Sequence, residues 1–280
     1  MELAEAEWRG RAAAHRTRMR RFTEPHNERR RRREQHPVLD FLFTYYSHRP
    51  QRLEQWHPGP GVVLRGGTDF LAHPGYVREG DGARLDPGAV PRLATTAAFV
   101  AALLKATAAR APRLGCFGVH EWAMVYRSPA PRHMTVPLRL GPAGTDAVVE
   151  ALPVHCTHHD AFRFFTPAAR PRNAVTPGRA DQADYEQPGC LHATMDLYKW
   201  AYKLSPATPS ELIADCFELA ADVREIDMRA SPYDLAPLGY APVPIETPAG
   251  RAAYVRAQTG FADRAAPLRA RLLDLCNQLI

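Results

Sequence analysis

The sequence predicts an α+β fold, a single mainly α-helical domain with a small antiparallel β-hairpin. Two kinds of pattern lead to this class. Residues 92–110, 190–204 and 208–228 show the apolar spacing of helices. Residues 134–152 alternate and turn as a hairpin does. With 280 residues, the chain is long enough to bury the core of one large domain.

Residues 1–36 are expected to form an arginine-rich N-terminal arm that packs weakly, and residues 37–280 a single helical catalytic domain. The arm holds eleven arginines and six glutamates, a net charge of +5, whereas the remaining chain carries only +1. The arginine run at 29–33 is suited to contacts with phosphates, for example those of DNA. A solvated basic helix or a disordered tail explains the same run.

The domain begins with residues 37–46, which are apolar on nearly all sides and indicate a buried helix. Asp40 is the only charged residue of this segment, so we expect it to pair with an arginine. Glycine and proline are frequent in residues 57–91, which predicts loops, with one short strand at 62–64.

The next two elements differ in kind. Residues 92–110 are rich in alanine and place Phe99 and Leu103 on one side, which predicts a helix. The hairpin follows, with one strand expected at 134–140, a turn at 141–144 and a second strand at 147–152.

The segment after the hairpin carries the densest group of titratable side chains. His155, His158, His159 and Asp160 lie within six residues. His155 shares one face with His159 in an extended chain, and with both His158 and His159 in a helix. Such a pair of imidazoles can bind a metal, with the carboxylate as a ligand or as a partner that orients one.

Residues 166–189 contain four prolines, which predicts a long irregular segment of the kind that closes over a functional site. The helix expected at 190–204 follows directly. It carries His192 and Asp196 one turn apart, which suits a ligand pair. An ordinary solvated face with an Asp196–Lys199 pair explains the same spacing.

A capping box at residues 208–211 predicts the start of a helix that runs to about 228. Asp227 falls on the apolar side of this helix, so it must be paired or functional, with Arg224 and Arg229 as neighbours. We therefore expect Asp227 to be the main acid–base residue. The final helix, from 247, is expected to break near Gly260 and again before Pro267.

Several classes of protein are disfavoured. The five cysteines include no C-x-x-C pair, which argues against a disulfide framework and a zinc ribbon. No apolar run approaches the length of a membrane span, and the N-terminus lacks a signal-peptide pattern, so a cytoplasmic protein without a membrane partner is expected. The oligomeric state is left open.

Residues 36–46 resemble a string found in actinobacterial proteins that carry the label 3-methyladenine DNA glycosylase. The resemblance covers nearly all of residues 36–275. The further similar stretches are 118–127, 160–170, 189–201 and 225–235.

This resemblance implies an enzyme that cleaves the N-glycosidic bond of an alkylated purine flipped out of the DNA stack. The arginine-rich arm would then contact the DNA backbone. The residues expected to bind the base are Trp56, Trp122, Tyr126 and Arg229. The carboxylates expected to orient water or stabilise the sugar cation are Asp227, Asp160 and Glu121.

The histidines support a different hypothesis, a metal-dependent enzyme that acts on a small molecule. Iron or zinc would be held by imidazoles and carboxylates, and residues 166–189 would close over the site. The expected ligands are His120, His155, His159 and His192, with Asp160, Asp196 or Asp227. A non-catalytic interaction protein is a third hypothesis, against which the histidine density and the buried Asp227 argue.

Overall fold

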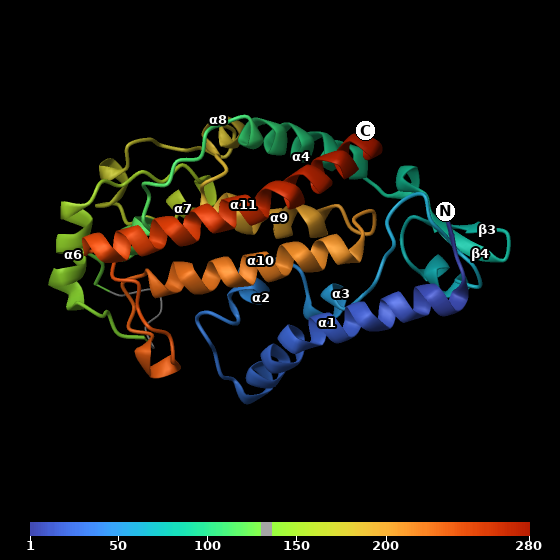
Figure 1. The fold of residues 1–280 in the computed structure, drawn as a ribbon, viewed down its shortest axis with the longest axis horizontal. Helices are drawn as coiled ribbons and strands as arrows, with labels where there is room; N and C mark the ends of the chain where they lie inside the picture. The colour runs from blue at the N-terminus through green and yellow to red at the C-terminus, as the bar shows by residue number, and fades with distance from the viewer. Residues whose placement is uncertain (130–135) are drawn as a thin grey trace. The chain divides into compact units, whose positions relative to one another are not determined.

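Figure 1 shows the computed structural model, which describes residues 1–129 and 136–280. The described chain is mainly helical and has one small sheet, so the expected α+β class is confirmed. The α-helices are α1 (Glu5–Arg32), α2 (Phe41–Tyr45), α3 (Pro50–Leu53), α4 (Leu93–Ala108), α5 (Val119–Ala123), α6 (Gly141–Ala151), α7 (His159–Phe162), α8 (Gln182–Tyr185), α9 (Leu191–Lys203), α10 (Ser210–Arg229) and α11 (Pro248–Leu279). The strands are β1 (Glu2–Leu3), β2 (Val63–Leu64), β3 (Tyr76–Glu79) and β4 (Gly82–Leu85).

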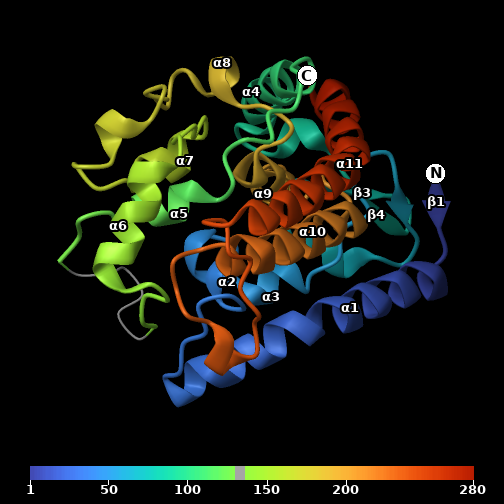
Figure 2. The ribbon, with the colours of Figure 1, turned by 60° about the vertical axis from the view of Figure 1, so that its left-hand side comes forward.

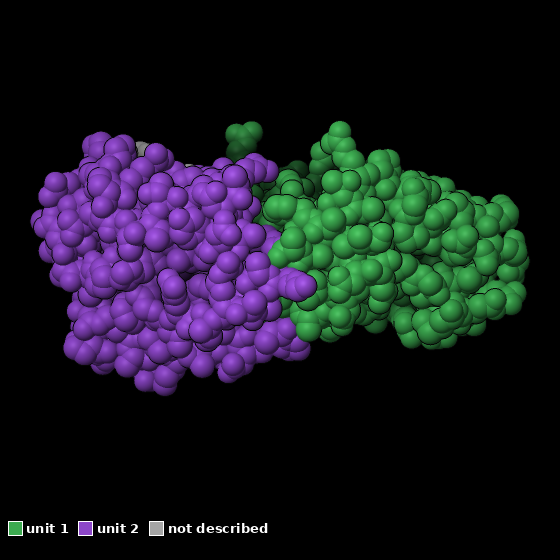
Figure 3. All heavy atoms as spheres, turned by 90° about the horizontal axis from the view of Figure 1, so that it is seen from above, with its two compact units in different colours: residues 1–102, 196–220, 268–280 green, residues 103–195, 221–267 purple. Residues whose placement is uncertain are grey.

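The chain forms two compact units, which Figure 3 colours separately. Unit 1 consists of residues 1–102, 196–220 and 268–280, and unit 2 of residues 103–195 and 221–267. The chain passes from one unit to the other within α4, α9, α10 and α11. The boundary expected at residue 36, and the single domain beyond it, remain predictions.

Helix α1 belongs to unit 1 and is firmly packed there. The expectation that residues 1–36 pack weakly is therefore wrong. The Trp8 ring meets Phe70 edge-on with 5.4 Å between ring centroids, and the Phe22 ring lies 5.0 Å from that of Phe217. The helix buries one stripe, which consists of Trp8, His15, Met19, Thr23 and His26.

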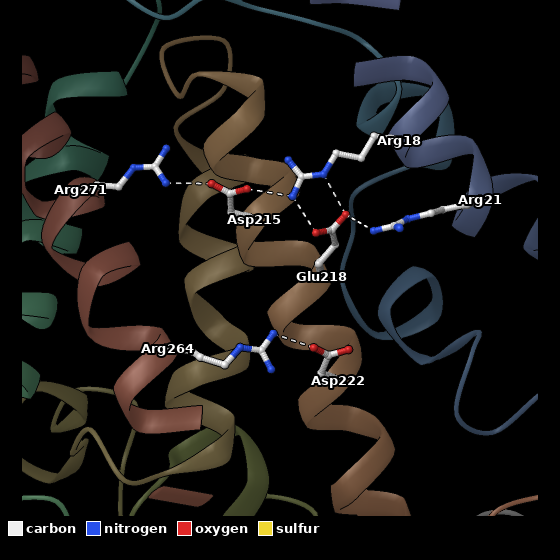
Figure 4. A network of polar contacts seen from close by, with 7 residues as sticks. All are labelled: Arg18, Arg21, Asp215, Glu218, Asp222, Arg264 and Arg271. Atoms are coloured by element: carbon white, nitrogen blue, oxygen red, sulfur yellow. Dashed lines mark hydrogen bonds and ion pairs between the residues drawn. The ribbon is translucent and has the colours of Figure 1, made fainter. Parts of the chain in front are cut away.

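Charged side chains fasten α1 to the first half of α10, as Figure 4 shows. Arg18 donates to both carboxylate oxygens of Glu218, at 2.8 and 2.6 Å, and to Asp215 at 2.8 Å. Arg21 also pairs with Glu218, and Arg271 donates to Asp215 at 2.8 Å. Part of the arginine excess of the N-terminal segment is thus paired within unit 1.

Asp40 is buried and paired, as expected. Arg29 donates to its carboxylate at 2.6 Å, the ring of His26 hydrogen-bonds it at 2.8 Å, and the backbone N–H of His36 donates at 2.8 Å. These donors hold the pKa of Asp40 below its usual value, against the effect of burial. The helix expected over 37–46 is shorter than predicted and comprises only α2.

The sheet lies in unit 1, in the strand order β1-β2-β4-β3, with β1 parallel to β2 and the other pairs antiparallel. The short strand expected at 62–64 is confirmed as β2. Its pairing with β4 requires a glycine at position 82, because a Cβ there would lie 2.0 Å from the carbonyl oxygen of Leu64.

The hairpin expected over 134–152 is wrong for the residues that the structure describes, since 141–151 form helix α6. Pro142 sits in its first turn, where no backbone N–H is needed, and Thr145, Val148 and Val149 form the buried side. Residues 134 and 135 of the first expected strand lie outside the described residues. Figure 2 shows α6 beside α5, against which it packs.

Three expected helices are confirmed as α4, α9 and α10. The breaks expected in the last helix are not: α11 runs from Pro248 to Leu279 with Pro267 inside it. Among the described helices, none combines the length and the apolar character needed to cross a membrane.

Candidate functional site

Unit 2 brings together three buried side chains that were expected to carry chemistry. His120 comes from α5, His192 from the first turn of α9 and Asp227 from the last turn of α10. Their exposed fractions are 4%, 7% and 0%, and one potential ligand atom of each lies within 4.8 Å of the others. The rings of His120 and His192 meet edge-on, with 4.5 Å between centroids.

Local backbone geometry explains how α5 reaches the end of α10. Gly118 precedes α5 with a φ of +73°, and a Cβ there would lie 3.2 Å from the Tyr254 ring and 3.4 Å from Ala230. Glycine is therefore favoured on both counts. Trp122 then donates its indole N–H to the carbonyl of Ala230 at 2.8 Å, which ties α5 to the chain just after α10.

The contact between His120 and Asp227 is short, but it is not a well-formed hydrogen bond. Nε2 of His120 lies 2.9 Å from Oδ1 of Asp227. Both atoms are fully buried, and neither has a hydrogen-bond partner of acceptable geometry among the described residues. Buried polar atoms are normally satisfied, so this pair needs an explanation. Attraction between the imidazolium and the carboxylate accounts for part of the contact, and a third atom on which both converge would account for the rest.

The separation of these two atoms fits two neighbouring ligands of an octahedral metal ion. Two ligand atoms, each about 2.1 Å from an ion and at right angles to one another, are about 3.0 Å apart. Two imidazoles and one carboxylate also form a standard donor set for iron and zinc. His120, His192 and Asp227 therefore offer the donor chemistry of a metal site, and the separation of the His120 and Asp227 atoms fits its spacing.

A buried ion pair orients Asp227. Arg224, only 1% exposed, donates to Glu121 at 2.8 Å and lies 3.4 Å from Oδ2 of Asp227. Oδ2 is thus engaged on one side, while Oδ1 faces His120. Partners of this kind fix a ligand's orientation. Glu121, expected to be catalytic, instead pairs with Arg224 behind the cluster.

The charges of the pair support each other. Burial opposes the charged form of Asp227, but the nearby imidazoles and Arg224 hold the pKa of the carboxyl far below its usual value. Burial likewise opposes a charged His120, yet the Asp227 carboxylate raises the pKa of that imidazole well above 6.5. Without a metal the pair is therefore an imidazolium and a carboxylate, and a metal ion would have to displace the proton of His120.

A cavity of about 280 Å³ opens beside the cluster, also in unit 2. Ala174, Val175 and Gln187 belong to the irregular segment 166–189, so that segment does line the site. Other lining side chains are the thiols Cys116, Cys156 and Cys190, the imidazoles His120, His155 and His192, and Arg113.

The three thiols differ in acidity. Burial raises the pKa of Cys156 to about 11 and that of Cys190 well above 9, so both are neutral. For Cys116 the same effect of burial is outweighed by a hydrogen bond with His120, and its pKa falls below the ordinary value.

Several expected ligands lie elsewhere. His155 is exposed and lines the cavity, outside the group of three. His159 and Asp160 lie on α7, where Asp160 is within 3.5 Å of both His159 and Arg163. Asp196 belongs to unit 1, where Lys199 donates to it at 2.6 Å and Tyr46 at 2.9 Å.

The residues expected to bind a base are buried or otherwise engaged. Trp122 is 0% exposed and Tyr126 2%, with the Tyr126 hydroxyl donating to Glu150 at 2.8 Å. Trp56 belongs to unit 1 and donates to Glu211 at 2.8 Å. Arg229 donates to the carbonyl of Ala241 and to Glu225.

His158 was not among the expected ligands, yet its ring stacks on that of His192 with 5.3 Å between centroids. It is 1% exposed, and Nε2 lies 3.4 Å from Glu186. In the sequence it was considered only as a partner of His155 in a helical segment.

No known protein family, curated protein or solved structure matches this chain, and the resemblance to glycosylases remains a prediction.

Proposed function

We propose that unit 2 is a metal-dependent enzyme centre in which His120, His192 and Asp227 hold a divalent iron or zinc ion and a small molecule occupies the adjoining cavity. One observation carries the proposal: two fully buried ligand atoms, 2.9 Å apart, face each other without a well-formed hydrogen bond. Burying such atoms is costly unless something satisfies them.

The three ligands leave coordination positions open, which is the arrangement of catalytic rather than structural metal sites. A bound metal would polarise a substrate oxygen and, if it is iron, supply redox chemistry. The chain's own residues have separate tasks. Arg224 and Glu121 orient the carboxylate, and the buried walls exclude water.

The glycosylase hypothesis is less well supported by the geometry. It requires aromatic faces on which a flipped base can stack, and Trp56, Trp122 and Tyr126 are each at most 5% exposed. The cavity of about 280 Å³ suits a small molecule, since pockets for small ligands start at about 300 Å³.

Binding of Co²⁺ to the metal-depleted protein tests the assignment, because the visible absorption of bound Co²⁺ reports its ligands. We expect one equivalent to bind with a nitrogen and oxygen spectrum. His192→Ala should weaken binding by about 100-fold or more, since even changes behind a ligand cost about 10- to 100-fold. His155→Ala, which alters a cavity residue outside the group of three, is the matched control and should bind normally. Equal Co²⁺ binding by the two variants would refute the assignment.

A second candidate uses two of the same residues without a metal. Cys116 lines the cavity and hydrogen-bonds His120, which faces Asp227, so thiol, imidazole and carboxylate form a chain typical of cysteine nucleophiles. Alkylation by iodoacetamide distinguishes the candidates. A metal-free protein in which Cys116 reacts at least about tenfold faster than Cys156 would favour the thiol mechanism.

A further inference from the structure

The rim of the cavity carries a fixed positive charge that the metal proposal does not use. Arg113 lies in the segment between α4 and α5, lines the cavity and is exposed. Within the described part of the chain, its guanidinium has no ion-pair partner. Neighbouring Arg110, by contrast, donates to the carbonyls of Ala106 and Glu186.

The backbone of Arg113 is held in place by a buried amide. Gln187, 5% exposed, accepts from the Arg113 N–H at 2.8 Å and donates to its carbonyl at 3.2 Å. The same side-chain oxygen accepts from the Gly189 N–H at 2.7 Å. A Cβ on Gly189 would lie 2.8 Å from the Arg113 carbonyl, so glycine permits this close approach.

A second buried side-chain amide links the same backbone to the cavity. Gln258 of α11 is 1% exposed and donates to the carbonyl of Gly189 at 2.5 Å and to the thiol of Cys116 at 3.6 Å. Because Gly189 also precedes α9, the backbone of Arg113 is fixed relative to His192. A backbone held firmly in place, with a charged side chain that has no ion-pair partner in the described protein, is suited to reversible binding of a ligand.

The rest of the lining favours an anion with an apolar body. Among the described residues that line the cavity, Arg113 is the only permanently charged one, and no carboxylate is present. Val175, Leu191 and the neutral thiols of Cys156 and Cys190 offer apolar surface. A guanidinium binds a carboxylate through two parallel hydrogen bonds.

We propose that the ligand of this cavity is a small organic carboxylate, with its carboxylate on Arg113 and its apolar body directed toward the His120, His192 and Asp227 cluster. This inference rests on the proposed metal function for the chemistry that follows, but not for the binding step itself. A single permanent charge on the lining suits a monoanion better than a phosphate.

The test is calorimetric titration of the full chain with benzoate and hexanoate, and with benzamide and hexanamide as neutral counterparts. We expect the acids to bind at least about tenfold more tightly than the amides, because a charged hydrogen-bonded pair is lost. Arg113→Met should remove that preference, and Arg113→Lys should retain part of it. Arg256→Met is the control, since it removes an exposed arginine from α11 of the same unit.

Each other outcome overturns the proposal. These outcomes are equal binding of acids and amides, no binding of either acid, or an Arg113→Met variant that binds acids normally. Tighter binding of inorganic phosphate than of either acid would replace the carboxylate with a phosphorylated ligand.

Metal content, measured on the same samples, separates this proposal from the previous one. Stoichiometric metal with acid binding that ignores Arg113 contradicts only the carboxylate inference. A protein that takes up no metal, yet binds acids through Arg113, contradicts only the metal centre.

Discussion

Each unit contains a buried histidine facing a buried aspartate at nearly the same distance, and the two pairs are built differently. In unit 1, Nδ1 of His26 forms a regular hydrogen bond with Asp40 at 2.8 Å. In unit 2, Nε2 of His120 lies 2.9 Å from Asp227 without one. Distance and burial alone would not distinguish a structural pair from a functional one.

The surroundings of the two carboxylates explain the difference. Arg29 and the backbone N–H of His36 also donate to Asp40, so that its oxygens are satisfied by the fold. Oδ1 of Asp227 has no such donor among the described residues, although Arg224 engages the other oxygen. In the structural pair both carboxylate oxygens of Asp40 accept hydrogen bonds from the protein. In the proposed metal site one oxygen of Asp227 stays available for the ion.

The largest predicted effect tests this comparison by changing the aspartate of each pair to asparagine. Asp227→Asn should lower metal affinity by about 100-fold or more, because a ligand charge is lost. Asp40→Asn should leave metal content unchanged and lower the free energy of unfolding by about 2 kcal/mol, since Arg29 loses a charged partner. Metal content and urea unfolding of both variants check this. Equal metal content in the two would show that the pairs are alike.

The next effect concerns Glu121, which the sequence assigned to catalysis and the geometry assigns to support. Glu121→Gln should lower the free energy of unfolding by about 3 kcal/mol, because it leaves the buried Arg224 without its partner at 2.8 Å. Glu225→Gln is the control. Its carboxylate is 46% exposed and pairs with Arg229, so its effect should stay below about 1 kcal/mol. A Glu121→Gln protein of unchanged stability would contradict the supporting role of Glu121.

Unit 1 also contains buried histidines that should make the folded state less stable in acid. Burial lowers the pKa of His48 and of His57 to about 4, and each hydrogen-bonds a tyrosine hydroxyl. Below pH 6.5 the unfolded chain binds protons that these folded imidazoles do not, so the free energy of unfolding falls between about pH 6.5 and 4.

Each of these histidines contributes at most about 1.4 kcal/mol per pH unit to that fall. His48→Gln keeps a partner for Tyr198 and removes one titrating group. Its free energy of unfolding should therefore fall less steeply with acid than that of the unsubstituted protein. Identical slopes between pH 6.5 and 5 in urea unfolding would contradict the assignment of a neutral, buried His48.

The smallest effect compares two surface ion pairs, both drawn in Figure 4. Arg18 of unit 1 forms a two-pronged pair with Glu218 and is 32% exposed, whereas Arg264 and Asp222 of unit 2 are 51% and 55% exposed. Arg18→Ala should cost about 1 kcal/mol and depend on salt, and Arg264→Ala less than about 0.5 kcal/mol. The reverse order in thermal unfolding would contradict this ranking.

The sequence sufficed for the fold class and for the helices with regular apolar spacing. Prediction from the sequence failed where the residue types in a segment suggested a different structure from the one it forms. Val148 and Val149 indicated a strand, but Pro142 and the alanines around them start and sustain α6. The packing of helix α1 was underestimated because its buried stripe includes His15, Thr23 and His26. These residues count as polar when the apolar spacing of a helix is assessed.

For the site, Asp227 stood out because a carboxylate on an apolar helix face needs a reason, and that argument located the centre of the cluster. His120 and His192 were candidates as well. Which histidines join Asp227 could not be read from spacing, because α5, α9 and α10 meet only through tertiary packing. The dense group around His155 attracted attention through proximity in sequence, yet none of its members joins the three.

The most direct test of the central claim is elemental analysis of the full chain, purified without chelators and again after incubation with Fe²⁺ or Zn²⁺ and removal of the excess. The account predicts about one iron or zinc ion per chain, which the Asp227→Asn variant neither retains nor takes up. A protein that carries no metal and acquires none, or a variant with an undiminished content, would contradict it.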